Sequence, residues 1–259
     1  MAQFRHQLGS TMTIAGAQIY YECHGLPASP TLVVLHGGFQ QMEVFNPLLE
    51  ALSDHYQLIG IDSRGHGRST LGDVPLSYQQ LQKDVEVLLA ALGITHCQIL
   101  GFSDGGIVGY RLASLSQSLN IDKLFTIGAR WHIEHALVCR DAFLATTAEQ
   151  RQHSQPQVYQ RYQQLNPEAD FPRLVKQLVT MWLDPTESGY PNEQVDAIDC
   201  PLLVARGDDD PLIARSVVFD IAQRLTQAQL CNVPFAKHMA FADQPLIFRQ
   251  LLAQFFQVQ

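Results

Sequence analysis

The sequence of 259 residues has no excess of positive charge. Its 17 Lys and Arg stand against 25 Asp and Glu, which gives a net charge of −8 at pH 7 with His neutral. Nucleic acids and anionic membrane surfaces are bound through basic patches, so this balance argues against both kinds of partner. Charged residues make up 16 % of the chain. This is below the roughly 25 % of an average globular protein, which argues against long disordered tails.

Long apolar runs and paired cysteine motifs are also missing. No apolar run approaches the ~18 residues of a membrane span, and the first ten residues contain no apolar stretch typical of a secretory signal. The five cysteines are odd in number and form no C-x-x-C pair, which favours buried free thiols in a reducing compartment. These absences predict a cytoplasmic protein.

Hydrophobic residues make up 46 % of the chain, enough for a full core, and they occur in short runs that alternate with helical patterns. Runs that are apolar on both faces and end in Gly or Asp are typical of parallel strands covered on both sides. We expect such strands at residues 31–36, 57–62, 97–101, 123–128, 201–207 and 229–233, an antiparallel edge strand at 17–24, and helices at 77–92, 106–118, 214–225 and 245–256. At the start of the first helix, Ser77 and Gln80 predict a capping box. This alternation predicts an α/β fold with a doubly wound, mostly parallel sheet.

One interval interrupts the alternation of strands and helices. Residues 131–196 contain no strand pattern and are rich in Gln, charged residues and helical patches. The interval is too long for a plain loop. We therefore predict a core formed by residues 1–130 and 197–259, with a small helical insertion at 131–196.

The most informative motif is Gly101-Phe102-Ser103-Asp104-Gly105, a G-x-S-x-G sequence between a predicted strand and a predicted helix. A serine on such a tight turn projects its hydroxyl above the carboxyl end of the sheet, where doubly wound folds bind their ligands. The motif therefore predicts a nucleophilic serine. The alternative interpretation is an ordinary glycine-rich turn in which Ser103 caps the helix.

A serine nucleophile needs a base, and the base needs an orienting acid. The acidic residues 208–210 follow one predicted strand, and His238 follows the next. If these strands are parallel, both loops lie at the same edge of the sheet as Ser103. We choose Asp210 as the acid, with Asp208 as the alternative, and His238 as the base.

The negative charge that develops on a carbonyl oxygen during acyl transfer needs backbone amide donors. The amide of Asp104, directly after the nucleophile, is one candidate. The other lies in the His36-Gly37-Gly38-Phe39 loop after the strand at 31–36. We place this donor at Gly38, with Phe39 as the alternative, while a simple tight turn would explain the glycines equally well.

Together these motifs resemble those of the α/β-hydrolase superfamily, in family order. The matching segments are His36-Gly37-Gly38 (oxyanion loop), Asp62-Ser63-Arg64-Gly65-His66-Gly67-Arg68-Ser69 (the D-x-R-G-x-G-x-S turn), Gly101–Gly105 (nucleophile elbow), Gly207–Asp210 (acid loop) and His238 (base loop). The resemblance implies a serine hydrolase without a cofactor, in which residues 131–196 form a cap over the active site. It also implies structural roles for Asp62 and Arg64.

Two further features of the sequence do not predict a cofactor. His132 and His135 share a helical spacing, but the sequence contains no H-E-x-x-H motif and no evident third ligand, so we expect no metal site. No G-x-G-x-x-G opens the first strand–helix unit, so no dinucleotide site is indicated.

We therefore predict an enzyme that cleaves a small to medium carboxylic ester through an acyl-enzyme intermediate. Its partner would be a small ester-like substrate, contacted by Phe39, Phe102, Trp131 and Trp182. Asp104 either complements the charge of the helix N-terminus or binds a substrate ammonium, as in an aminoacyl ester. The same triad also serves C–C hydrolases, enol-lactonases, thioesterases and perhydrolases. In another class, it occurs in ligand-sensing or binding proteins with slow turnover.

Overall fold

The structure is a computed structural model that describes residues 3–49 and 52–257, so the outermost positions of the predicted core, 1–2 and 258–259, lie outside it. Eight strands form one sheet in the order β1-β2-β4-β3-β5-β6-β7-β8. The strands are β1 (Ser10–Ile14), β2 (Ala17–His24), β3 (Thr31–Leu35), β4 (Gln57–Ile61), β5 (His96–Phe102), β6 (Asn120–Ile127), β7 (Leu202–Gly207) and β8 (Ala228–Val233). All neighbours from β4 to β8 in this order pair in parallel, so the predicted α/β fold class is confirmed.

The amino-terminal side of the sheet is antiparallel. β2 pairs antiparallel with β4, as predicted, but it is not the edge strand, because β1 pairs along its outer side. The sequence prediction missed β1. Ala15 and Gly16 join the two strands with positive φ angles of 45° and 78°, the backbone that a tight β-hairpin turn requires. Only Met12 and Ile14 are apolar in this short strand, and most of its side chains are exposed, so the alternation is too brief to reveal it.

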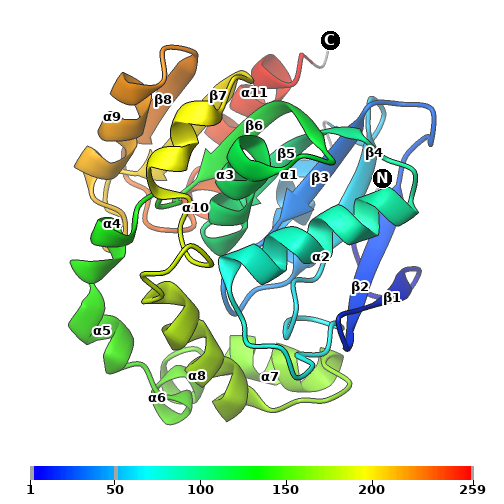
Figure 1. The fold of residues 1–259 in the computed structure, drawn as a ribbon, viewed down its shortest axis with the longest axis vertical. Coiled ribbons are helices and arrows are strands. Elements are labelled where there is room, and N and C mark those ends of the chain that lie inside the picture. Colours follow the sequence, from blue (N-terminus) through cyan, green and yellow to red (C-terminus); the bar gives the residue numbers. More distant parts are fainter. Residues whose placement is uncertain (1–2, 50–51, 258–259) are drawn as a thin grey trace.

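Helices cover both faces of the sheet (Figure 1). On one face lie α2 (Tyr78–Ala91), α3 (Asp104–Leu115) and α9 (Arg215–Arg224), and on the other lie α1 (Asn46–Leu49), α10 (Ala240–Asp243) and α11 (Pro245–Phe255), with the 3₁₀ helix η1 (Met42–Phe45). Alternate residues of β3 serve the two faces: Val33 and Leu35 pack in one core, Leu32 and Val34 in the other. Burial on both sides explains why these strands are apolar throughout. No described helix is both long and apolar enough to cross a membrane.

The start of α2 differs in detail from the prediction. The Ser77 hydroxyl accepts a hydrogen bond from the Gln80 amide nitrogen at 3.1 Å, as expected for an N-cap. The Gln80 side chain, however, donates to Asp84 Oδ1 at 2.9 Å instead of to Ser77. The predicted capping box is therefore only half formed, because Asp84 provides a better acceptor one turn further along the helix.

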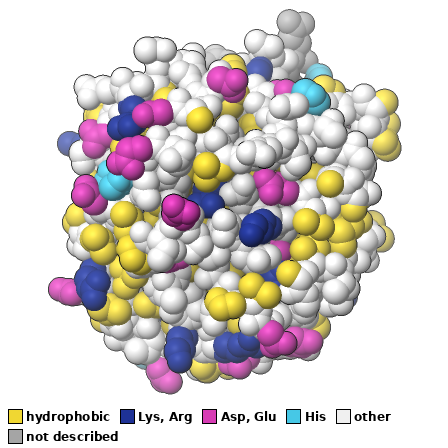
Figure 2. All heavy atoms as spheres, in the orientation of Figure 1, with side chains coloured by type: hydrophobic (Ala, Val, Ile, Leu, Met, Phe, Trp, Pro, Cys, Tyr) yellow, Lys and Arg dark blue, Asp and Glu magenta, His cyan; other side chains and the backbone are white. Residues whose placement is uncertain are grey.

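Residues 131–196 lie between β6 and β7 and are largely helical. They form α4 (Ile133–Leu137), α5 (Arg140–Leu144), α6 (Ala148–Ser154), α7 (Pro156–Leu165), α8 (Phe171–Trp182) and the 3₁₀ helix η2 (Asn192–Ala197). α5 to α8 gather at one end of the molecule, away from α11 (Figure 1). On the face shown in Figure 2, positive and negative side chains are interspersed. Whether this segment acts as a cap stays a prediction.

Candidate active site

The turn that carries Ser103 is strained and tightly packed. Ser103 links β5 to α3 with φ 51° and ψ −118°, a backbone conformation that non-glycine residues rarely adopt. A Cβ atom at Gly101 would lie 2.6 Å from the Gly105 carbonyl oxygen, and one at Gly105 would collide with the Leu35 carbonyl. The two glycines of the motif are therefore required by close backbone contacts. They allow β5 to turn sharply into α3 and leave the hydroxyl at the carboxyl edge of the sheet.

His238 lies between Ser103 and Asp210. Its Nε2 is 3.1 Å from Ser103 Oγ, and its Nδ1 is 2.8 Å from Asp210 Oδ2. Gly128, just after β6, borders the imidazole, since a Cβ there would be 3.2 Å from His238 Nδ1. The ring of Phe102 supports the imidazole from the side of α10, with 5.0 Å between the ring centroids. The structure thus brings together the serine, the histidine and the acid that the sequence proposed.

Asp210 is held as an ion within its own loop. Its Oδ1 accepts from the backbone amides of Leu212 and Ile213 at 2.8 and 3.1 Å, while its Oδ2 faces His238. Burial raises the pKa of this carboxyl, but the hydrogen bond and charge of His238 and the two amides outweigh it, so the pKa lies below its ordinary value.

The alternative acid, Asp208, points elsewhere. Its carboxylate accepts from Arg215 Nε and Nη2 at 2.6 and 2.7 Å and from Asn232 Nδ2 at 2.8 Å. These partners lower the pKa of Asp208 to about 2, first through the hydrogen bonds of Arg215. Asp208 therefore stabilises the acid loop from outside, and Asp210 is the acid that faces the histidine.

The loop after β3 is fixed by a buried histidine. His36 Nε2 accepts from the Ser63 amide at 2.9 Å, so its Nδ1 carries the proton and donates to the Gly37 carbonyl at 2.8 Å. Burial lowers the pKa of His36 to about 4, which keeps the ring neutral and this donor pattern intact. The imidazole thereby ties the loop of residues 36–39 to the turn after β4.

The predicted oxyanion donors lie next to each other across this loop. A Cβ at Gly37 would be 2.9 Å from Ser103 Cβ, and one at Gly38 would be 2.7 Å from Asp104 Oδ2. In the part of the chain that the structure describes, the amides of Gly38, Phe39 and Asp104 donate to no backbone or side-chain group. They are free to bind a ligand oxygen, and the choice of Gly38 over Phe39 stays a prediction.

The sequence is similar to that of known proteins along most of its length. A family model described as alpha/beta hydrolase fold matches residues 30–191, which include the β3 loop and the serine turn. The chain belongs to the alpha/beta hydrolase fold family. The predicted resemblance is thus confirmed, and the family supports a hydrolase.

Three similar proteins illustrate the range of this family. A protein of Caulobacter sp. (strain K31) named "Putative carbamate hydrolase RutD" is 29 % identical over 264 residues, covering 92 % of this chain and 95 % of its own. A hydrolase from Pseudomonas aeruginosa PA01 has a TM-score of 0.79 at 23 % identity, covering 96 % and 98 % of the two chains. The enol-lactonase from Burkholderia xenovorans LB400 has a TM-score of 0.74 at 20 % identity, covering 96 % and 100 %. The two solved structures share the fold.

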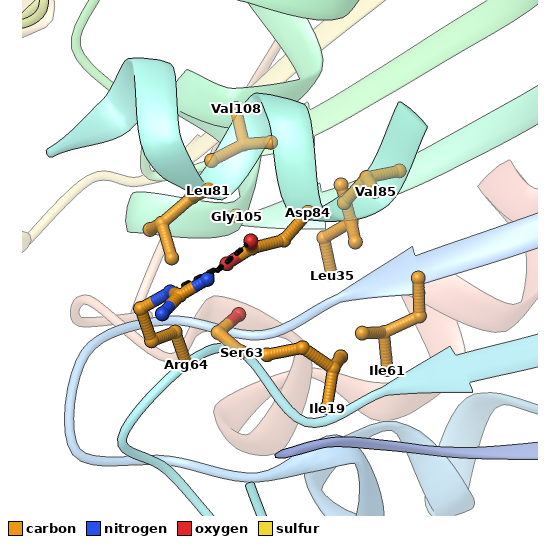
Figure 3. Close-up of a pocket in the computed structure, with 10 residues that line it drawn as sticks. All are labelled: Ile19, Leu35, Ile61, Ser63, Arg64, Leu81, Asp84, Val85, Gly105 and Val108. Carbon is orange, nitrogen blue, oxygen red and sulfur yellow. Dashed lines mark hydrogen bonds and ion pairs between the residues drawn. The ribbon is translucent and has the colours of Figure 1, made fainter. Parts of the chain in front are cut away.

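The turn after β4, typical of this hydrolase family, is held by two buried charge clusters. Arg64 donates to Asp84 of α2 through Nε at 2.8 Å and Nη2 at 2.6 Å, and the two joined side chains line a small pocket (Figure 3). Asp62 accepts from the Met42 and Arg68 amides at 3.1 and 2.8 Å. Both residues thus hold the backbone below the serine turn, as the family resemblance implied.

Asp104 is a buried carboxylate beside Ser103. Its Oδ1 accepts from the Tyr78 hydroxyl at 2.8 Å, and both its oxygens lie 3.0 Å from Trp182 Nε1. Burial raises the pKa of Asp104 above its ordinary value, although the two hydrogen bonds and the charges of Arg130 and His238 act against this. The carboxylate thus connects α2, the serine turn and the end of α8. Its proposed contact with a substrate ammonium stays a prediction.

The four aromatic residues predicted to contact substrate divide into two groups. Phe39 and Trp182 pack edge to face, with 5.8 Å between centroids, directly beside Gly38 and Asp104. Phe102 is buried on the opposite face of the sheet, below His238. Trp131 points toward α9, because its indole N–H donates to the Val217 carbonyl at 3.1 Å. The structure therefore places Phe39 and Trp182 at the loop next to Ser103, and it places the ring edge of Phe102 against Gly37 of the same loop, where a Cβ would be 3.0 Å from the ring. Trp131 is turned away from this loop.

Sequence reasoning missed two residues close to the site, Tyr78 and Arg130. Nothing in the sequence links Tyr78, in the first turn of α2, to Asp104. Arg130 could have been found, since it lies three residues after the end of β6 and functional side chains collect at the carboxyl ends of parallel strands.

Proposed function

We propose that this hydrolase cleaves a carboxylic ester through an acyl-enzyme intermediate on Ser103. The observation that carries the proposal is the continuous hydrogen-bonded chain from Ser103 Oγ through His238 to Asp210. A serine hydroxyl is a weak nucleophile on its own, and it becomes effective when an oriented imidazole removes its proton during attack. The free amides beside Ser103 supply the second requirement, a site for the oxyanion.

The reaction proceeds in two balanced steps. Ser103 Oγ attacks the carbonyl carbon while its proton passes to His238 Nε2, and the amides of Gly38 and Asp104 bind the oxyanion. The ester C–O bond then breaks, and the departing alcohol takes the proton from Nε2. Water next gives a proton to Nε2 and attacks the acyl carbonyl, and Ser103 regains that proton as the acid leaves. Asp210 keeps Nδ1 protonated and stabilises the imidazolium in both steps.

The Ser103→Ala variant tests this assignment. We expect kcat for ester hydrolysis to fall roughly a million-fold, to the rate that binding and the oxyanion donors support alone. The measurement is acid release from a panel of short- and medium-chain esters, including aminoacyl esters. An unchanged rate in the variant would refute the serine mechanism. A wild type that binds esters without turning them over would favour the ligand-sensing class instead.

A second candidate is hydrolysis of a carbamate by the same residues. The relative from Caulobacter carries that activity in its name and aligns with 92 % of this chain. A carbamate also has a carbonyl that Ser103 could attack, with an amine in place of the alcohol as leaving group. Ammonia release from carbamates, measured beside acid release from esters, decides between the two candidates.

A further inference from the structure

Arg130 occupies a junction between the triad and the helical insertion. It follows β6 and is 7 % exposed. Its Nε donates to the His135 carbonyl at 3.1 Å, and its Nη2 donates to the Leu212 carbonyl at 2.6 Å. Leu212 belongs to the loop whose amides hold Asp210. The guanidinium is thus fixed in one orientation by both the acid loop and the insertion.

The positive charge of Arg130 has no carboxylate within 4.0 Å among the described residues. Two other buried guanidiniums are paired: Arg64 lies 2.6 Å from Asp84, and Arg206 lies 3.4 Å from Asp208. Arg111 is also buried without a carboxylate within 4.0 Å among the described residues, but it donates to Gln82 Oε1 and to the carbonyls of Glu187 and Gly189. A buried charge without a counter-ion is unfavourable unless a ligand supplies one. Nη1 of Arg130 makes no hydrogen bond in the described part of the chain. Two N–H donors therefore remain available.

A chain of contacts leads from Arg130 to the nucleophile. The guanidinium lies 5.2 Å from the ring centroid of Phe143, which packs against Trp182 at 5.0 Å, and Trp182 donates to Asp104. The charge of Arg130 reaches Asp104, where it acts to lower the pKa. Arg130 therefore lies at the same end of the site as the residue next to Ser103.

A second guanidinium without a carboxylate partner lies over the oxyanion loop. Arg151 of α6 sits 4.3 Å above the ring of Phe39, and its Nε is buried without a hydrogen-bond partner in the described chain. The aromatic rings of Phe39, Trp182 and Phe143 thus have a guanidinium at either end, in a protein with a net charge of −8. The local excess of positive charge contrasts with the acidic chain as a whole.

We infer that this hydrolase selects substrates that carry a carboxylate on the acyl part, and that Arg130 binds that carboxylate through Nη1. The inference rests on the proposed function and adds the substrate class. Arg151 strengthens the attraction from the side of Phe39. Asp104 does not cancel it, because its oxygens already accept from Tyr78 and Trp182 and its burial disfavours the charged form. A guanidinium held by two carbonyls is well suited to a planar carboxylate.

Matched esters test this selectivity. Monomethyl succinate and methyl 4-methylpentanoate have acyl groups of the same shape, but only the first carries a negative charge. We expect the wild type to prefer the anionic ester in kcat/KM. In Arg130→Gln this preference should fall about 10- to 100-fold, as expected for a lost charged hydrogen bond, while the rate on the neutral ester is retained. Arg151→Gln should reduce the preference less.

Two further variants separate recognition from folding. Arg130→Lys retains the charge and should keep part of the preference even if Arg130→Gln is poorly folded. Arg140→Gln, an exposed arginine on α5, should leave both rates unchanged. Equal losses on both esters in Arg130→Gln would assign the residue to loop support only and overturn the inference. A wild type that prefers the neutral ester or the cationic methyl 4-aminobutanoate would also overturn the inference.

A binding measurement keeps this inference distinct from the proposed chemistry. Calorimetric titration of the wild type with succinate, which contains no ester, should show binding that weakens at least about tenfold in Arg130→Gln and is unchanged in Arg140→Gln. If esters are not cleaved but succinate binds in this manner, the proposed function fails and the anion site stands. If esters are cleaved but succinate does not bind, the anion site fails alone.

Discussion

Two carboxylates lie near Ser103, each 7 % exposed, yet their pKa values shift in opposite directions. Asp210 meets two backbone amides of its own loop and the imidazole of His238, and these favour its ionised form. Asp104 accepts hydrogen bonds only from the neutral donors of Tyr78 and Trp182, and burial prevails over these bonds and over the more distant charges of Arg130 and His238. The difference shows that backbone amides and a charged imidazole can offset the cost of burying a carboxylate, whereas two neutral donors do not.

The largest expected effect in this comparison concerns Asp210. Asp210→Asn keeps the size of the side chain but removes the charge that orients His238, so kcat on esters should fall by about three to four orders of magnitude. Steady-state kinetics on a single ester provide the measurement. Asp208→Asn is the matched control in the same loop and should keep most of the activity, since Asp208 contacts Arg215 and Asn232 instead of the histidine. Similar losses in both variants would contradict the assignment.

Asp104→Asn should have a smaller effect on activity, within about tenfold in kcat, because the change alters one or two hydrogen bonds beside the serine.

The pH dependence of the free energy of unfolding is a more informative test of Asp104. Because the folded-state pKa of Asp104 is raised, the unfolded state loses this proton first as pH rises. The free energy of unfolding of the wild type should therefore fall relative to Asp104→Asn as pH rises from the ordinary Asp pKa through the raised one. Denaturant titrations from pH 4 to 7 measure this difference, and an opposite slope would show that Asp104 is stabilised as an ion.

The sequence alone predicted the triad because its three members each follow a strand, and parallel strands bring their carboxyl ends to one edge. It also allowed the choice of Asp210 over Asp208 for contact with the histidine. It did not predict the direction of Trp131, which depends on the acceptor that Val217 provides on a helix 86 residues further along. It did not predict β1 either, because this five-residue edge strand has only two apolar residues, Met12 and Ile14, too few to reveal a strand.

The helical insertion shows the same limit of sequence reasoning. Its helical character was readable from the spacing of apolar residues in α8, whose buried side chains lie on one face. The contacts that connect it to the core, such as Trp182 with Asp104 and Arg161 with Glu43, join residues 78 and 118 positions apart. Such pairs depend on how the helices fold back over the sheet, and no local pattern encodes them.

We propose that Ser103, activated by His238, is the nucleophile of this hydrolase. A fluorophosphonate probe, which reacts with activated serines, tests it directly by intact-mass and peptide mass spectrometry. We predict a single adduct, located on Ser103, that is absent from Ser103→Ala and forms far more slowly in Asp210→Asn. No adduct on the folded wild type, or an adduct on another residue, would contradict the account.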